Sequence, residues 1–337
     1  MKKRLCLFAF AGLILLSGTS ALADFYVIPV PSKPLKNVIT VAKGGGKFTN
    51  PVAAVNSITD ASASNPYLVV IGPGVYTLTQ TLVMKEYVDI VGSGENVTKL
   101  QGAISTSSPD ASSAIISGAN SATLGSLTVE NTGGGYLSIA LYNQSTSPTV
   151  SHVTAMASGG TYSYGVYNDS SSPTMTNVTA TASGAFSNWG VYNYLSSPTM
   201  TEVTASSSGG TTANRGVENA ASDATMINVI ATASGGTYSY GVKNSSSSPN
   251  MTNVIATASG GTQSYGVFNG LSSPVIRRST MEGDFRSLYG IGTVSETYTA
   301  TVSQSTLIGA TSTDTGAVNK CVACDDGSGT PLDGDCH

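Results

Sequence analysis

The strongest constraint on this 337-residue chain is a sequence unit that returns every 25 or 26 residues. One proline marks the unit, and a single copy carries Ala224 in its place. The marker positions are Pro148, Pro173, Pro198, Ala224, Pro249 and Pro274. The motif Gly-Val-x-Asn keeps the same rhythm from Gly165 to Gly266. A fixed period of this length is typical of solenoids, in which each unit packs on its neighbours.

The spacing of apolar residues indicates which solenoid this is. No unit contains a long run with helical spacing, and the apolar residues fall in short, nearly alternating runs such as Met175, Val178, Ala180 and Ala182. Such runs, separated by Gly, Ser, Asn and Pro, predict strands joined by turns. One unit holds roughly three strands of ordinary length. The sequence therefore predicts an all-β fold, a single right-handed parallel β-helix with coils about 4.8 Å apart.

Stacking of the coils predicts columns of like residues along the axis. One expected buried column is Val153, Val178, Val203, Val229 and Val254. A second begins at Val150 and continues through Met175, Met200, Met226 and Met251. A third is Asn143, Asn168, Asn193, Asn219, Asn244 and Asn269. Stacked amides can hydrogen-bond to each other, so the third column can be polar and still lie inside.

The ends of the solenoid need covering, because each would otherwise expose unpaired strand edges. At the front, Asn50 and Pro51 have the residue types of a helix N-cap and first turn, and they predict a short capping helix. At the back, residues 298–310 predict one or two further strands. We expect the β-helix to span residues 24–310, with 25-residue repeats at about 138–290, and a cysteine-containing tail or cap at 311–337.

The first 23 residues have the pattern of a signal peptide. Lys2, Lys3 and Arg4 precede an apolar run, and Ala21-Leu22-Ala23 is a small-x-small cleavage site. A secreted or periplasmic protein is expected, with no membrane span. Once these three cations are removed, 12 of the 15 basic residues remain against 19 acidic ones. That balance does not suit a nucleic-acid phosphate backbone, so no nucleic-acid partner is expected.

The segment from Val38 to Gly102 carries a family resemblance. Its pieces TVAKGGGKF, YLVVIGPGVY and VDIVGSGENVTKLQG resemble the opening of pectinesterases, which belong to the pectin-lyase-like superfamily of right-handed parallel β-helices. The repeat YGVYNDSSSPTMTNVTA resembles the general β-helix repeat of secreted bacterial proteins. The resemblance implies the fold. It does not supply an active site, because the four motifs with the catalytic Gln, Asp and Arg of pectinesterases are absent and Leu78 replaces a glutamate of the family.

Other catalytic residues are hard to find by pattern. Glu282, Asp284 and Arg286 form the densest charged group near the repeats and are weak catalytic candidates, although a solvated loop explains them equally well. His152 shares a column with Asn177, Asn228 and Asn253, which favours a hydrogen-bonded turn residue. No cofactor and no metal site are expected.

Three cysteines remain after the signal peptide, and they lie close together at the C-terminus. Cys321, Cys324 and Cys336, followed by His337, have the residue types of a zinc site. In an exported protein a disulfide is the stronger expectation. We favour Cys321–Cys336, with Cys324 as the alternative partner for either.

Two aromatic columns run along the repeats, and the first consists of Tyr164, Trp189, Arg215, Tyr240 and Tyr265. Tyr142, Tyr167 and Tyr192 follow apolar residues that we expect to point inward, so alternation places these rings outside. They are the candidate ligand-binding residues, because exposed rings can stack on sugar rings. The other interpretation is that the rings stack on each other and stabilise successive coils.

The sequence thus favours a secreted, non-catalytic β-helix protein. It would bind carbohydrate or another surface component, or serve as an extracellular structural module. The partner would be a polysaccharide or a cell-surface component, and the oligomeric state stays open. The competing hypothesis is a polysaccharide-active enzyme, an esterase or a lyase, whose catalytic residues the patterns do not reveal.

Overall fold

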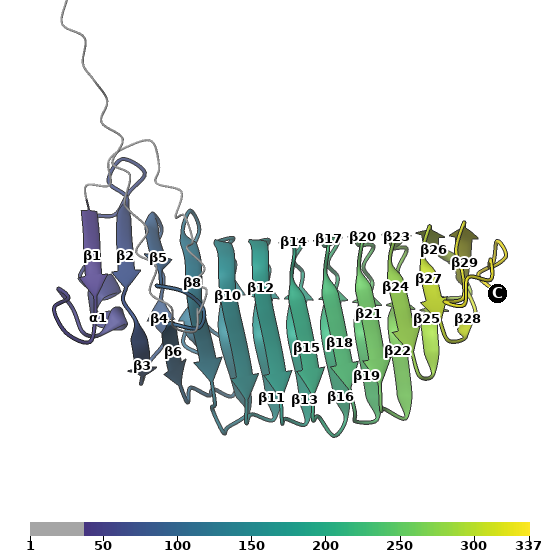
Figure 1. Cartoon of the computed structure of the whole chain (residues 1–337), viewed down its shortest axis with the longest axis horizontal. Coiled ribbons are helices and arrows are strands. Elements are labelled where there is room, and N and C mark those ends of the chain that lie inside the picture. Colours follow the sequence, from purple (N-terminus) through teal and green to yellow (C-terminus); the bar gives the residue numbers. More distant parts are fainter. Residues whose placement is uncertain (1–36) are drawn as a thin grey trace, which may run out of the picture. The chain divides into compact units, whose positions relative to one another are not determined.

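The computed structural model describes residues 37–337, so the expected signal peptide at 1–23 lies outside the described residues. Within them, no helix is both long enough and apolar enough to span a membrane. The described chain winds into a parallel β-solenoid with almost no helix, as the repeat predicted (Figure 1). One strand per coil builds a ten-stranded sheet on one side, and the remaining strands pair in register along the rest of each coil.

Three strand faces follow one another around each coil. The first face contains β1 (Asn37–Val41), β2 (Tyr67–Ile71), β5 (Val88–Val91), β14 (Thr199–Thr201), β17 (Thr225–Ile227), β20 (Asn250–Thr252), β23 (Val275–Arg277), β26 (Tyr298–Ser303) and β29 (Ala317–Val322). The second contains β3 (Gly74–Leu78), β6 (Thr98–Gly102), β15 (Thr204–Ser208), β18 (Ile230–Ser234), β21 (Ile255–Ser259), β24 (Thr280–Gly283) and β27 (Thr306–Ile308). Three long strands bend across both faces: β8 (Thr123–Asn131), β10 (Thr149–Ser158) and β12 (Thr174–Ser183).

The third face is the ten-stranded sheet. Its strands are β4 (Leu82–Val83), β7 (Ala114–Ser117), β9 (Leu137–Gln144), β11 (Tyr162–Asp169), β13 (Ser187–Tyr194), β16 (Ala213–Ala220), β19 (Tyr238–Ser245), β22 (Gln263–Gly270), β25 (Arg286–Ile291) and β28 (Thr311–Thr313). The solenoid pairing continues past Ala310, since β28 pairs with β25 and β29 pairs with β26. The C-terminal segment therefore supplies the last strands as well as the tail.

The short helix expected near the front is α1 (Pro51–Asn56). The Asn50 side chain accepts hydrogen bonds from the backbone nitrogens of Val52 and Ala53, and Pro51 opens the first turn. Val52, Ala54 and Val55 are buried and belong to the main core. This apolar side of the helix packs against β1, β2 and β4.

A left-handed residue makes the bend between the first and second faces. His152, Asn177, Glu202, Asn228 and Asn253 all have φ between 53° and 55°. Asparagine adopts this conformation more readily than most residues, which accounts for its recurrence in the column. The structure thus places His152 at a turn, as the column predicted.

The valine and methionine columns are buried as predicted. Every member from Val153 to Val254 is at most 1% exposed, and Met175, Met200, Met226 and Met251 are fully buried. The paired strands keep the columns in register from coil to coil, with Val153 beside Val178 and Met175 beside Met200. Repetition therefore builds one continuous apolar core.

The asparagine column forms a buried amide ladder. Asn143 donates from Nδ2 to Oδ1 of Asn168 at 2.8 Å, and each later asparagine donates in the same sense to the next, as far as Asn269. The two ends, Asn143 Oδ1 and Asn269 Nδ2, are buried and have no hydrogen-bond partner. Between them the ladder satisfies polar groups inside the coil, as the sequence predicted.

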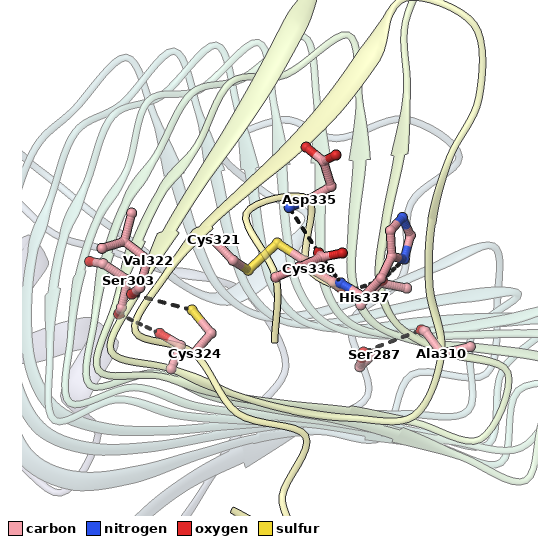
Figure 2. The surroundings of a disulfide bond; sticks show 12 residues. Ser287, Ser303, Ala310, Cys321, Val322, Cys324, Asp335, Cys336 and His337 are labelled. Carbon is pink, nitrogen blue, oxygen red and sulfur yellow. Dashed lines mark hydrogen bonds between the residues drawn. A yellow bond between two sulfur atoms is a disulfide. The ribbon is translucent and has the colours of Figure 1, made fainter. Parts of the chain in front are cut away.

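The C-terminal tail is tied to the last coil. Cys321 on β29 is joined by a disulfide to Cys336, and these are the two cysteines favoured from the sequence (Figure 2). Cys324 is a buried free thiol whose Sγ lies 3.6 Å from the carbonyl oxygen of Val322. Within residues 37–337 no three His, Cys, Asp or Glu side chains are grouped as a metal site.

Candidate binding surface on the third sheet

The outer side of the third face, the ten-stranded sheet, carries both aromatic columns. Val166 points into the main core, whereas Tyr164 and Tyr167 belong to a separate outer cluster. The glycine between Tyr164 and Val166 interrupts the strict alternation. A Cβ on Gly165 would lie 2.8 Å from the backbone nitrogen of Thr181 on the facing strand, so only glycine fits. This break brings the two columns together on one side of the sheet.

The outer rings pack against each other rather than stand free. The ring centroids of Tyr142 and Tyr167 are 5.1 Å apart, and those of Tyr167 and Tyr192 are 5.0 Å apart. Tyr164 stacks on Trp189 at 4.6 Å with nearly parallel planes. A second run of stacked rings continues in the later coils with Tyr240 and Tyr265, 5.4 Å apart.

This packing corrects the expectation of an exposed stripe at Tyr142, Tyr167 and Tyr192. Tyr142 is fully buried, Tyr167 is 9% exposed, and only Tyr192 is half-buried. The rings do lie on the outer side, as alternation required. The coil spacing, however, matches the distance at which neighbouring rings contact each other, so each tilted ring packs against the next and shields it from solvent.

The exposed rings lie at the edge of this cluster. Tyr136 and Phe186 are 49% and 48% exposed, and Tyr162 lies half-buried between them. The Tyr162 ring is nearly perpendicular to both, at centroid distances of 5.1 Å and 6.3 Å. We call these three residues the aromatic rim. Column analysis missed it because Tyr136 and Phe186 lie in the turn before the third face and Tyr162 is the first residue of β11, where the repeat varies from copy to copy.

A buried charged group separates the two runs of stacked rings. Glu218 takes the place of a tyrosine in the column, and its carboxylate lies 2.9 Å from Arg215 Nε and 2.7 Å from Lys243 Nζ. Trp189 donates its indole N–H to the same carboxylate, and the Arg215 guanidinium lies 4.5 Å over the Trp189 ring. Burial alone would raise the pKa of Glu218, but the two cations and the hydrogen bonds from Lys243 and Trp189 hold that pKa below its usual value.

The tyrosines of the cluster are kept neutral by their surroundings. Burial raises the pKa of Tyr142 and Tyr164 far above the usual value. Burial also raises the pKa of Tyr167, to about 12, with the Asp169 carboxylate as a second cause. The phenol of Tyr142 donates a hydrogen bond of 3.1 Å to Asp169. The surface therefore presents neutral rings and hydroxyl groups over a wide pH range.

The two carboxylates among the weak catalytic candidates, Glu282 and Asp284, have no interaction partner in common in the described part of the chain. Glu282 and Asp284 are exposed, and Asp284 accepts a hydrogen bond from the backbone nitrogen of Gly260 at 2.8 Å. Arg286 lies over the rings of Phe285 and Tyr289 and hydrogen-bonds to Ser312. The contacts of these side chains are those of a turn and of ring packing.

Two cavities lie at the C-terminal end of the solenoid, away from the aromatic surface. One, of about 260 Å³, is lined by Asn319, Asp335 and His337 among others, and the other, of about 250 Å³, by Thr311, Leu332 and Cys336. Figure 2 shows Cys336 and His337 on the tail beside the last strands. Neither cavity is lined by the catalytic candidates Glu282, Asp284 and Arg286 or by the candidate ligand-binding tyrosines.

Comparison with known proteins gives structural matches alone. No protein-family model matches the chain, and no curated protein sequence matches it. The solved structures that match include pectin methylesterase from carrot, with 14% identity over 88% of this chain and 85% of that chain and a TM-score of 0.45. Pectate lyase Pel9A matches with 13% identity over 88% and 79% of the two chains, at a TM-score of 0.45.

A third match is ORF18 of Geobacillus virus E2, with 12% identity and a TM-score of 0.47. The chain covers 61% of that protein's length, and 84% of this chain takes part. The carrot pectin methylesterase and pectate lyase Pel9A are parallel β-helix proteins. This chain is a parallel β-helix too. At these identities the likeness concerns the fold alone.

Proposed function

We propose that the protein is a secreted, non-catalytic binding module that contacts a neutral polysaccharide through the aromatic rim, at the start of the third face. The observation that carries the proposal is the exposure of Tyr136 and Phe186 beside an otherwise packed aromatic cluster. Large exposed rings grouped together are unusual on a surface that meets only water.

The chemistry of the rim fits sugar rings. The C–H side of a pyranose is apolar and packs on an aromatic ring face, while tyrosine hydroxyl groups can bond to sugar hydroxyl groups. The three rim residues lie on successive coils, about 4.8 Å apart per step, so together they span roughly two sugar units. Under this proposal Tyr142 and Tyr167 support the surface from below, and half-buried Tyr192 stands at its border.

Each ring contact is weak, so retention requires several contacts acting together. The double variant Tyr136→Ala, Phe186→Ala removes both outer rings of the rim. We expect retention on insoluble polysaccharides to fall by about tenfold, because two linked contacts are lost at once. The matched control is Val322→Ala, which truncates another exposed apolar residue, 65% exposed, at the C-terminal end.

The measurement is a binding isotherm of the full chain on a panel of insoluble polysaccharides, with pectin included, and circular dichroism to check the fold. Equal retention of the double variant and the wild type, or no retention of the wild type on any polysaccharide, contradicts the proposal. Release of soluble sugar or methanol by the wild type would favour the alternative, a polysaccharide-active enzyme of esterase or lyase type.

A further inference from the structure

The bend between the first and second faces carries an exposed apolar patch in the middle of the solenoid. Ile230 and Ile255 are neighbours on β18 and β21, and their side chains are 41% and 45% exposed. The coils on either side have threonine at this position, Thr204 and Thr280. Ile227 on β17 is exposed on the other side of the bend, and both adjacent coils again have threonine there. Apolar surface is therefore added only at the centre of this stretch.

Charged residues of opposite sign flank this patch along the bend. The bend column continues with Glu202, Asn228, Asn253 and Arg278, one residue per coil, all exposed and all with a left-handed backbone. Arg278 Nε donates to Asn253 Oδ1 at 3.2 Å, and Asn253 Nδ2 donates to Asn228 Oδ1 at 3.0 Å. Within residues 37–337 neither Glu202 nor Arg278 has an ion-pair partner. We call these four residues and the three isoleucines the bend ridge.

The order of residues along the bend ridge is self-complementary. Consider a two-fold rotation that reverses the solenoid axis and is centred between the coils of Asn228 and Asn253. It sets Glu202 of one copy opposite Arg278 of the other, and the reverse contact follows by symmetry. It also sets Ile230 opposite Ile255. This is the relation required at the interface of a two-fold symmetric dimer, in which the same patch is used by both copies.

Other arrangements of two ridges match less well. Copies that run parallel bring Glu202 against Glu202 and Arg278 against Arg278, and like charges at close range oppose association. A register shifted by one coil toward the N-terminus sets Glu202 opposite Asn253 and Ile255 opposite Thr204, so the ion pairs and the apolar contact are both lost. The charge pattern therefore selects one direction and one register.

We propose that the bend ridge is the contact surface of an antiparallel homodimer, with a second copy of this chain as the partner. The isoleucines supply apolar area, and the two symmetry-related ion pairs fix the register. The ridge is a narrow strip, smaller than an obligate interface, so the dimer forms in concentrated solution and dissociates in dilute solution. The aromatic rim lies at a different bend, and this inference is independent of the proposed function.

The test is sedimentation equilibrium of the full chain over a concentration series at low ionic strength. We expect a reversible dimer that weakens as salt is added, because exposed ion pairs are screened. Glu202→Arg sets like charges against each other at two places in the dimer, and so does Arg278→Glu. We expect each single variant to raise the dimer dissociation constant by about tenfold or more.

Charge exchange is the sharpest part of this test. The two single variants mixed in equal amounts should dimerise with each other, because every charge then faces its opposite. The double variant Glu202→Arg, Arg278→Glu should dimerise by itself for the same reason. Both residue types already occupy this left-handed column, so the backbone accommodates the exchange.

The apolar contact is tested with the residue that the adjacent coils carry. We expect Ile230→Thr, Ile255→Thr to weaken the dimer by about tenfold, because apolar area is lost at two places. The matched control is Ile291→Thr, which changes an exposed isoleucine on the third face and should leave dimerisation as in the wild type.

Circular dichroism establishes that each variant is folded, and the variants that fold carry the comparison. A wild type that stays monomeric at every concentration overturns the proposal. A dimer that is insensitive to both single charge variants overturns it too, as does a mixture of the two folded single variants that stays monomeric. If the wild type is monomeric and Ile230→Thr, Ile255→Thr lowers retention on polysaccharide, a sugar chain occupies the ridge and the homodimer is again excluded.

Discussion

At the scale of single residues, the outer surface depends on one substitution within a column. Glu218 stands where preceding coils have tyrosine, and it is buried between Arg215, Lys243 and Trp189. A buried carboxylate is tolerated only where cations and donors compensate its lost hydration. The cluster of charges thus fills the gap between the two runs of stacked rings, with the Arg215 guanidinium over both Trp189 and Tyr240.

The first residue-scale prediction concerns acid stability. Because the folded state holds the pKa of Glu218 below its ordinary 4.5, the stabilisation is present above that value and is lost as pH falls through the lower, folded pKa. Glu218→Gln leaves two cations without their partner, at a cost of about 3 kcal/mol at neutral pH. Urea unfolding over a pH series should show the wild-type and variant stabilities converging in acid.

The control for this prediction is Glu202→Gln, which neutralises an exposed carboxylate at a bend of the solenoid. Its stability should follow the wild type at every pH. A constant difference between Glu218→Gln and the wild type down to strong acid would mean that the ion pairs do not carry the effect.

At the scale of elements, the strand β12 shows how one short sequence serves two environments. Val178 and Ala180 point into the core, while Thr179 and Thr181, which alternate with them, face outward. Substitution of neighbouring residues on this strand therefore tests directly which side chains build the core. It also explains why a polar-looking repeat can still fold around an apolar interior.

The element-scale prediction compares two neighbours on this strand. Val178→Asp places a charge in the buried valine column, and we expect a loss on the order of 4 kcal/mol or failure to fold. Thr179→Asp adds the same group on the outer side and should cost far less. Soluble yield and melting temperature measure both, and equal behaviour of the two variants would show that the inward column is misassigned.

At the scale of the whole described solenoid, stability comes from contacts between adjacent coils, so the last coil is held on one side only. The disulfide between Cys321 and Cys336 closes a 15-residue separation and ties the tail to β29. It restrains the unfolded chain at the place where neighbour contacts are fewest.

The prediction at this scale is that Cys336→Ser lowers the stability of the C-terminal coil by about 3 kcal/mol, the value expected for a loop of this length. Hydrogen exchange should show faster exchange in β28 and β29, with the coils around β12 unchanged. Uniformly faster exchange along the solenoid would instead indicate that the end and the middle unfold as one unit.

The sequence by itself determined the solenoid, its core columns and its amide ladder. A repeat with zero register shift leaves few choices, because Val153 must lie beside Val178 and Asn143 beside Asn168. The N-cap at Asn50 could also be predicted from the sequence, because its hydrogen bonds involve only the residues that directly follow it.

The tertiary structure decided how exposed the outer rings are. Alternation gives the side of the sheet on which Tyr142 lies, but its burial depends on Tyr167 of the next coil, whose ring in turn stacks on Tyr164. The aromatic rim and the ion pairs of Glu218 likewise join residues of different coils. The exposure of a side chain and the compensation of its charge depend on which residues lie beside it in space. A periodic pattern along the chain specifies the column in which a residue lies, but it does not specify which side chains cover that residue.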